Sequence, residues 1–269
     1  MKNLIIVLVM ALLAGCGAKK SESVEEVILE QDHDVNLPAD GFNYEASDPE
    51  AVIIADKVMT AMGGRKAWDE TRYITWTFFG KRRLLWDKYT GDVRIDYLDR
   101  EEKLLVNINS MNGKASVDGQ EITESDSLAG YLKKAKSIWI NDSYWLVMPY
   151  KLKDAGVSLY YLGNDTTETG QESFVLQLAF ENVGDTPNNI YNVWVDTESN
   201  LVTQWAFFEN SEQPNPSFIT PWEDYKKYEN IMLSGGRGKG QLTDIKVLSE
   251  VPEKAFTSFE PVTTMTKNL

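Results

Sequence analysis

Histidine and cysteine, two side chains on which much enzyme chemistry depends, each occur once in this 269-residue chain. His33 lies in an acidic stretch, and Cys16 lies at the end of an apolar N-terminal run. With this supply, a Ser-His-Asp triad, a Cys-His pair and a zinc site of histidine and cysteine ligands cannot be assembled from the chain alone. Carboxylates are abundant, but no pair stands out for a hydrolase that uses carboxylates only. We therefore expect no catalytic residue, no cofactor and no bound metal.

The formal net charge of −14 excludes further classes of function. Binding to nucleic acid depends on basic side chains that displace counterions from phosphates, and no basic surface of that kind is predicted. Peripheral docking on an anionic bilayer through charge is disfavoured for the same reason. We expect neither a nucleic-acid partner nor a membrane contact made by charge alone.

The N-terminus carries a targeting signal. Lys2 precedes an apolar run over residues 4–14, which is shorter than the roughly 20 residues that a spanning helix needs. Such a run predicts a signal peptide over residues 1–15 rather than a membrane-spanning helix.

The run ends in Leu13-Ala14-Gly15-Cys16, which resembles a bacterial lipobox. That resemblance implies an acylated Cys16, bearing palmitate-type chains, at the mature N-terminus; an ordinary signal peptide with a chance cysteine is the alternative. Gly17, rather than aspartate, follows the cysteine, as in lipoproteins sorted to the outer membrane of Gram-negative bacteria. We expect a lipid-anchored protein of the cell envelope, held at the outer membrane through Cys16.

The remaining chain divides by composition. Residues 16–46 are rich in Ser, Glu and Asp, which predicts an acidic, disordered tether after the lipidated cysteine. Residues 47–269 have globular composition and contain no further linker, so a single β-rich domain is expected there. Ser47 and Glu50 have capping-box spacing and predict a helix that ends at Gly63-Gly64.

Residues 71–98 predict an antiparallel meander. Ile74, Trp76 and Phe78 alternate with Tyr73, Thr75 and Thr77, so the first strand has one apolar face and one face suited to water. Further strands follow as far as residue 248, for about ten in all. Residues 125–148 interrupt them with helical spacing, and a second helix is expected to start at Asp142 or Ser143. The expected fold is mainly β: a curved antiparallel sheet forming an unclosed half-barrel, its concave face covered by the N-terminal helix and the mid-chain helices.

This order of elements, with the segments MGGRKAW, TRYITWTFFG, LLWDKYTGDVRI and WLVMPYKLKDAGVSLYYLG, resembles the Lol-type lipoprotein-carrier superfamily. Within it, the segments are similar to a group of uncharacterised Bacteroidota lipoproteins. The resemblance implies an apolar cavity beneath a helical lid that holds an acyl chain, a lipid or another hydrophobic ligand.

Candidate binding residues follow from the aromatic content. The side chains expected to line such a cavity are Ile74, Trp76, Phe78, Trp86, Val106, Trp139 and Trp145. Trp194 and Trp205 belong to the same aromatic set, and the alternative for all of these rings is an ordinary packed core. Arg82 and Arg83 are the candidates for a cationic rim that meets a lipid head group, with a solvated strand end as the alternative. Two functions stay open: a binding protein for a hydrophobic ligand, and a structural or assembly lipoprotein that binds a protein partner without a ligand cavity.

Overall fold

The computed structural model describes residues 36–181 and 188–266, whose strands form two antiparallel sheets. The larger sheet has nine strands. In spatial order they are β12 (Glu223–Tyr228), β13 (Ile231–Arg237), β14 (Gly240–Leu248), β1 (Tyr73–Phe78), β2 (Arg82–Asp87), β3 (Asp92–Tyr97), β4 (Glu102–Asn107), β5 (Gly113–Val117) and β6 (Gln120–Glu121).

The smaller sheet has five strands. They are β11 (Phe218–Pro221), β10 (Val202–Phe208), β9 (Ile190–Asp196), β8 (Glu172–Phe180) and β7 (Val157–Thr166). Only Trp222 separates β11 from β12, so the chain passes directly from one sheet into the other. The expected single curved sheet is therefore divided at this residue. The expected class is confirmed: the described strands are antiparallel, they do not close into a barrel, and a few helices accompany them.

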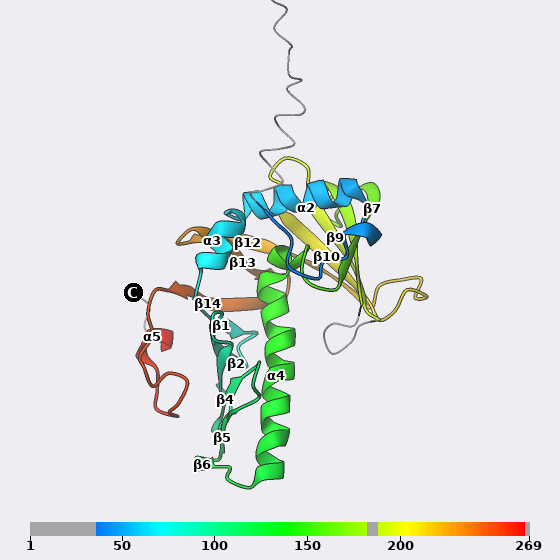
Figure 1. Cartoon of the computed structure of the whole chain (residues 1–269). Helices are drawn as coiled ribbons and strands as arrows, with labels where there is room; N and C mark the ends of the chain where they lie inside the picture. The colour runs from blue at the N-terminus through cyan, green and yellow to red at the C-terminus, as the bar shows by residue number, and fades with distance from the viewer. Residues whose placement is uncertain (1–35, 182–187, 267–269) are drawn as a thin grey trace, which may run out of the picture. The chain divides into compact units, whose positions relative to one another are not determined.

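Two helices cover the apolar face of the sheets (Figure 1). The long helix α4 (Ser125–Val147) runs along the larger sheet, and α2 (Pro49–Ala61) crosses near its end. The shorter helices are η1 (Tyr44–Ala46), α3 (Gly64–Glu70), η2 (Met148–Lys151) and α5 (Thr263–Thr266). One large cluster of buried side chains from α2, α4 and both sheets fills the space between them. Burial of this apolar surface supplies the main driving force for folding.

The start of α2 differs from the expected capping box. The N-cap is Asp48, and its side chain makes no capping hydrogen bond. Instead, Asp48 Oδ2 accepts from the backbone N–H of Tyr161 at 2.9 Å, and Ser47 Oγ accepts from that of Leu159 at 3.0 Å. β7 is an edge strand whose N–H groups need partners. The polar side chains before α2 therefore accept hydrogen bonds from the N–H groups of the sheet edge rather than from those of the helix.

The mid-chain helix is continuous, so the predicted restart at Asp142 or Ser143 is wrong. Asp142 lies inside α4 and is fully buried. Its two carboxylate oxygens accept hydrogen bonds from Arg82 Nε at 2.6 Å and Nη2 at 2.7 Å. In the sequence, this aspartate resembled a helix N-cap. Its hydrogen-bond partner is instead Arg82, on a strand that is distant in the chain. The ion pair joins α4 to β2.

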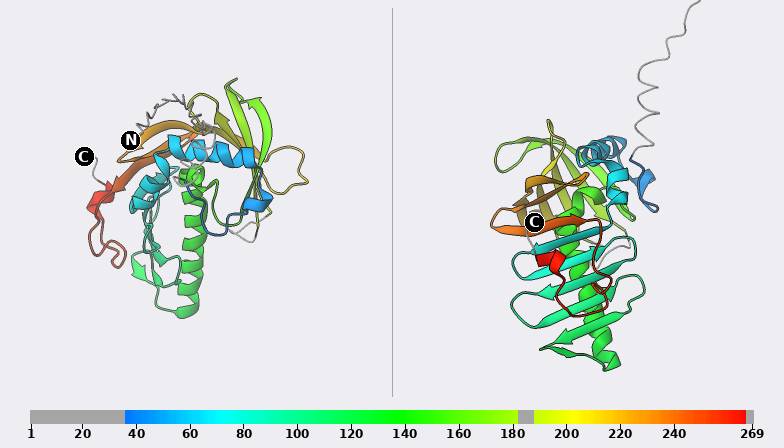
Figure 2. Two further views of the ribbon diagram at one scale, coloured as in Figure 1. Left: turned by 45° about the horizontal axis from the view of Figure 1, so that its top comes forward. Right: turned by 90° about the vertical axis from the view of Figure 1, so that its left-hand side faces the viewer.

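The outer face of β1 is also covered, in contrast to the expected wettable face. Thr75 and Thr77 are buried, and the C-terminal residues 249–266 lie across this side of the larger sheet (Figure 2, right). Arg94, which is completely buried, holds them: its guanidinium donates to the backbone oxygens of Ala255, Ser258, Phe259 and Glu260. Sequence periodicity did not indicate this segment, because it forms almost no regular structure.

Residues 36–46, expected to belong to the tether, pack against the folded body. Asn36 is buried, and its side chain donates to Thr60 Oγ1 at 2.9 Å. Lys153 Nζ donates to the backbone oxygen of Asn36, and the Ala39 N–H donates to that of Lys153 at 3.0 Å. Within the described ranges, the folded chain therefore starts before Ser47. No helix in those ranges is both long enough and apolar enough to cross a membrane.

Candidate functional site

A partly open cavity of about 530 Å³ lies between the C-terminal half of α4 and the smaller sheet. From α4, the aromatic rings of Trp139, Tyr144 and Trp145 line it. Strands β8 to β11 contribute five more rings, those of Phe180, Tyr191, Trp205, Phe207 and Phe218. Tyr144 and Trp145 follow Trp139 by five and six residues along α4. Trp205 and Phe207 are two residues apart on β10, so their side chains share one face of the sheet. Eight of the seventeen described residues that line the cavity are therefore aromatic.

The rings support one another at close range. Tyr191 stacks on Trp205 with 5.0 Å between ring centroids, and Trp145 meets Trp205 edge-on at 4.9 Å. Arg237 fixes the end of the helix, because its Nη2 donates to the backbone oxygen of Trp145 at 2.6 Å. Phe218, which packs on Trp145 at 5.7 Å, is 36% exposed and marks the open side. The cavity is thus largely preformed, as ligand sites usually are.

The polar atoms of three lining side chains are buried. Tyr144 Oη, Trp139 Nε1 and Trp205 Nε1 are shielded from solvent and have no hydrogen-bond partner among the described residues. Burial raises the pKa of Tyr144 well above its ordinary value, so its hydroxyl stays protonated. The rings consequently present carbon to the cavity, which suits an apolar occupant.

The charged side chains among the described lining residues come from a single short segment. Lys151, at the end of η2, forms an ion pair with Asp154, and both side chains contribute to the wall. The side chains are 26% and 39% exposed, which places them between the void and solvent. The cavity therefore has an aromatic body and a charged margin.

The structure separates the predicted cavity residues into two groups. Trp139 and Trp145 line the cavity. Five others lie in the packed core beneath α4 and α2, at most 7% exposed: Ile74, Trp76, Phe78, Trp86 and Val106. Trp139 connects the groups, since its ring meets that of Trp86 edge-on at 5.3 Å. The open space thus lies over the smaller sheet, and a ligand contact by the five core residues remains a prediction.

The two arginines expected at a rim do not line this cavity. Arg82 is held by Asp142, as described above, and burial raises the pKa of Asp142 although the bonds from Arg82 oppose that rise. Arg83 Nη2 lies 3.7 Å from a carboxylate oxygen of Asp244 on β14, beyond the intervening strand β1. Both guanidiniums are thus engaged with carboxylates of other elements. A role for either arginine toward a head group remains a prediction.

Several lining residues were missed by sequence reasoning. Phe180, Tyr191, Phe207 and Phe218 lie at or near the ends of four strands, at the same end of the smaller sheet. Phe180 shares its face with Phe174, Leu176 and Leu178, so its inward direction was visible in the alternation. Their convergence on α4 was not visible, because it depends on the packing of elements that are distant in sequence.

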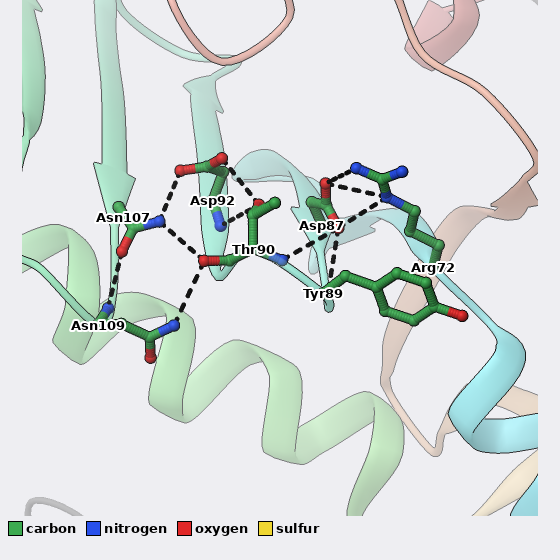
Figure 3. Close-up of polar contacts among 7 residues, drawn as sticks. All are labelled: Arg72, Asp87, Tyr89, Thr90, Asp92, Asn107 and Asn109. Carbon is green, nitrogen blue, oxygen red and sulfur yellow. Dashed lines mark hydrogen bonds and ion pairs between the residues drawn. The ribbon is translucent and has the colours of Figure 1, made fainter.

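A second polar cluster lies at the turn between β2 and β3 (Figure 3). Burial raises the pKa of Asp87, but hydrogen bonds from Arg72 and the Tyr89 N–H outweigh it and keep that pKa below its ordinary value. Asn107 Nδ2 donates to Asp92 Oδ1 at 2.8 Å and to the Thr90 oxygen at 2.9 Å. These contacts fix the turn. The described residues contain no group of three or more metal-ligating side chains there or elsewhere.

Cys16 and His33 lie outside the described residues, as do the predicted signal peptide and the first part of the predicted tether. Acylation of Cys16 therefore remains an expectation from the sequence.

Comparison with known proteins gives no family for this chain. No protein-family model matches it. No curated protein matches it. It is similar to the solved structure of a DUF1329 family protein from Desulfovibrio piger, with 13% identity, a TM-score of 0.44, and coverage of 78% of this chain and 98% of that chain.

Two further solved structures are similar to this chain. One is a domain from Vibrio parahaemolyticus described as an outer membrane lipoprotein-sorting protein, with 10% identity, a TM-score of 0.37, and coverage of 77% and 96%. The other is a LolA superfamily protein from Nitrosomonas europaea, with 12% identity, a TM-score of 0.36, and coverage of 77% and 97%. At these values the likenesses transfer no function to this chain.

Proposed function

We propose that this protein is an envelope lipoprotein that binds a hydrophobic ligand, an acyl chain or a lipid, in the cavity between α4 and the smaller sheet. The aromatic-lined cavity of about 530 Å³ is the observation that carries this proposal. Small-molecule sites typically measure about 300–1,000 Å³ and have mostly apolar walls. Each methylene that leaves water contributes about 0.8 kcal/mol, so an acyl chain gains affinity along its length.

The anchoring part of the proposal comes from the sequence. Acyl chains on Cys16 would hold the protein at a membrane of the cell envelope, with the outer membrane favoured by Gly17. A single acyl chain gives only marginal membrane binding, whereas two give stable anchoring. Intact mass of the protein extracted from an envelope-containing host would test this. The mass of acyl chains should be present in the wild type and absent from Cys16→Ser.

Ligand binding is tested by native mass spectrometry of the full chain after mild extraction, followed by denaturing analysis of released lipid. We expect a co-purifying lipid. Ala155 lines the cavity and is exposed, so Ala155→Trp should fill part of the void and lower lipid occupancy. Ala129, exposed on the N-terminal part of α4 and outside the cavity, provides the matched control Ala129→Trp.

The alternative function is a lipoprotein that binds a protein partner and carries no ligand. A wild-type protein free of lipid that also takes up no added lipid would reject the ligand-binding proposal and favour this alternative. Equal lipid occupancy in Ala155→Trp and Ala129→Trp would place the ligand elsewhere on the protein.

A further inference from the structure

The charged margin of the cavity suggests which end of a ligand it receives. Among the described residues that line the cavity, Lys151 and Asp154 are the charged ones, and they lie in one segment. Neutral side chains such as Ile140 and Val157 line the cavity together with the aromatic rings. An occupant that fits this division has an apolar chain and a polar head.

The sign of the head group follows from the ion pair. Asp154 already shows that a carboxylate can bind the Lys151 ammonium at this place. Because Asp154 is the more exposed partner, at 39%, it can turn toward water when another anion arrives. Hydrogen bonds between ionised groups are roughly twice as strong as neutral ones. The net charge of −14 gives anions no general attraction to the protein, so selectivity for them has to come from this local contact.

We infer that the cavity selects an anionic amphiphile with one acyl chain, and that Lys151 binds its head group while Asp154 competes for the same ammonium. This inference rests on the proposed function, because it assigns a ligand class to the same cavity. A fatty-acid carboxylate and a phosphate head group share the required chemistry.

Two substitutions with opposite effects test the inference on the full chain. Lys151→Gln should weaken binding of dodecanoate about tenfold, the loss expected for one charge-assisted hydrogen bond. Asp154→Asn removes the competing carboxylate and should strengthen dodecanoate binding several-fold. Lys133, which is exposed on α4 and does not line the cavity, supplies the matched control Lys133→Gln, which should bind as wild type does.

The probes are dodecanoate, dodecyl phosphate and methyl dodecanoate, each titrated below its aggregation limit. Fluorescence of the lining tryptophans Trp139, Trp145 and Trp205 reports occupancy. Methyl dodecanoate has the same chain without a charge, so neither Lys151→Gln nor Asp154→Asn should change its affinity. The ratio of dodecanoate to dodecyl phosphate affinity identifies the better head group, and tighter binding of either anion than of the ester supports the inference.

The outcomes separate this inference from the proposed function. If the ester binds wild type as tightly as both anions do, and Lys151→Gln changes nothing, the inference is refuted while a hydrophobic cavity stands. If no probe binds wild type, both the proposed function and the inference are refuted. Thermal unfolding of each variant checks folding, and the gain expected for Asp154→Asn cannot arise from misfolding.

Discussion

Replacing Arg82 with methionine should destabilise the protein at neutral pH more than replacing both Arg82 and Asp142. The two side chains form a bidentate ion pair between β2 and α4, with distances of 2.6 and 2.7 Å. Asp142 is completely buried, and the Arg82 side chain is 17% exposed. Methionine keeps much of the length of arginine but leaves the carboxylate buried without its charged partner.

Breaking a buried pair in this way typically costs about 3–5 kcal/mol. Because Arg82 retains some contact with solvent, we expect about 3 kcal/mol for Arg82→Met. The double variant Arg82→Met/Asp142→Leu removes both charges and should lie within about 1 kcal/mol of wild type. Since α4 supplies one wall of the cavity, Arg82→Met should also weaken ligand binding.

The cost should depend on pH with a defined sign. Burial already raises the pKa of Asp142 in the folded protein, and loss of Arg82 raises that pKa further. A group with a raised folded-state pKa favours folding at low pH, and this contribution is lost as pH rises through the folded-state pKa. Acidification protonates Asp142 and removes the buried charge. The cost of Arg82→Met should therefore be smaller at pH 5 than at pH 7.

Urea unfolding followed by tryptophan fluorescence measures these differences in the free energy of unfolding. Arg72→Met provides a control that should cost less, because Arg72 is 42% exposed and Asp87 keeps the backbone donors of Tyr89 and Thr90. Equal costs for Arg82→Met at pH 7 and pH 5, or a double variant less stable than Arg82→Met, would contradict the reasoning.

Three further predictions concern the backbone, the C-terminal segment and a buried lysine. Gly63→Ala should destabilise by more than about 1 kcal/mol, because Gly63 has φ = 112° and an added Cβ would lie 2.2 Å from the Asn230 oxygen; Gly130→Ala, with open space in α4, should be neutral or stabilising in the same thermal unfolding assay. Arg94→Met should release residues 249–266 and accelerate their cleavage in limited proteolysis, whereas unchanged cleavage would argue against the guanidinium as their main attachment. Burial lowers the pKa of Lys88 to about 7, so the free energy of unfolding of the wild type should increase as pH rises from 7 toward 10. Lys88→Met should lack that increase in urea unfolding. If the stability of wild type and variant changed with pH in the same way, the lowered pKa of Lys88 would be refuted.

Much of the fold followed from local patterns. Alternation in residues 71–98 predicted the meander of β1, β2 and β3, and the start and stop signals at Ser47 and Gly63-Gly64 predicted α2. Local patterns gave a wrong prediction where the hydrogen-bond partner of a polar side chain is distant in sequence. Asp142 resembled a helix start, but its carboxylate is satisfied by Arg82 on a strand, and the helix continues through it. Ser47 and Glu50 have capping-box spacing, but the side chains of Ser47 and its neighbour Asp48 accept hydrogen bonds from the edge of β7.

The sequence by itself determined that the chain lacks a histidine- or cysteine-based catalytic set and that its strands are antiparallel with an aromatic face, because residue types and their periodicity are local properties. It also carries the lipobox-like motif at Cys16, whose acylation remains a prediction. The tertiary structure alone decided where that aromatic face is filled. Trp76 and Trp86 are packed beneath helices, whereas Trp145 and Trp205 border open space. A cavity is the volume left between surfaces of distant elements, so it depends on how α4 rests on both sheets rather than on any single segment.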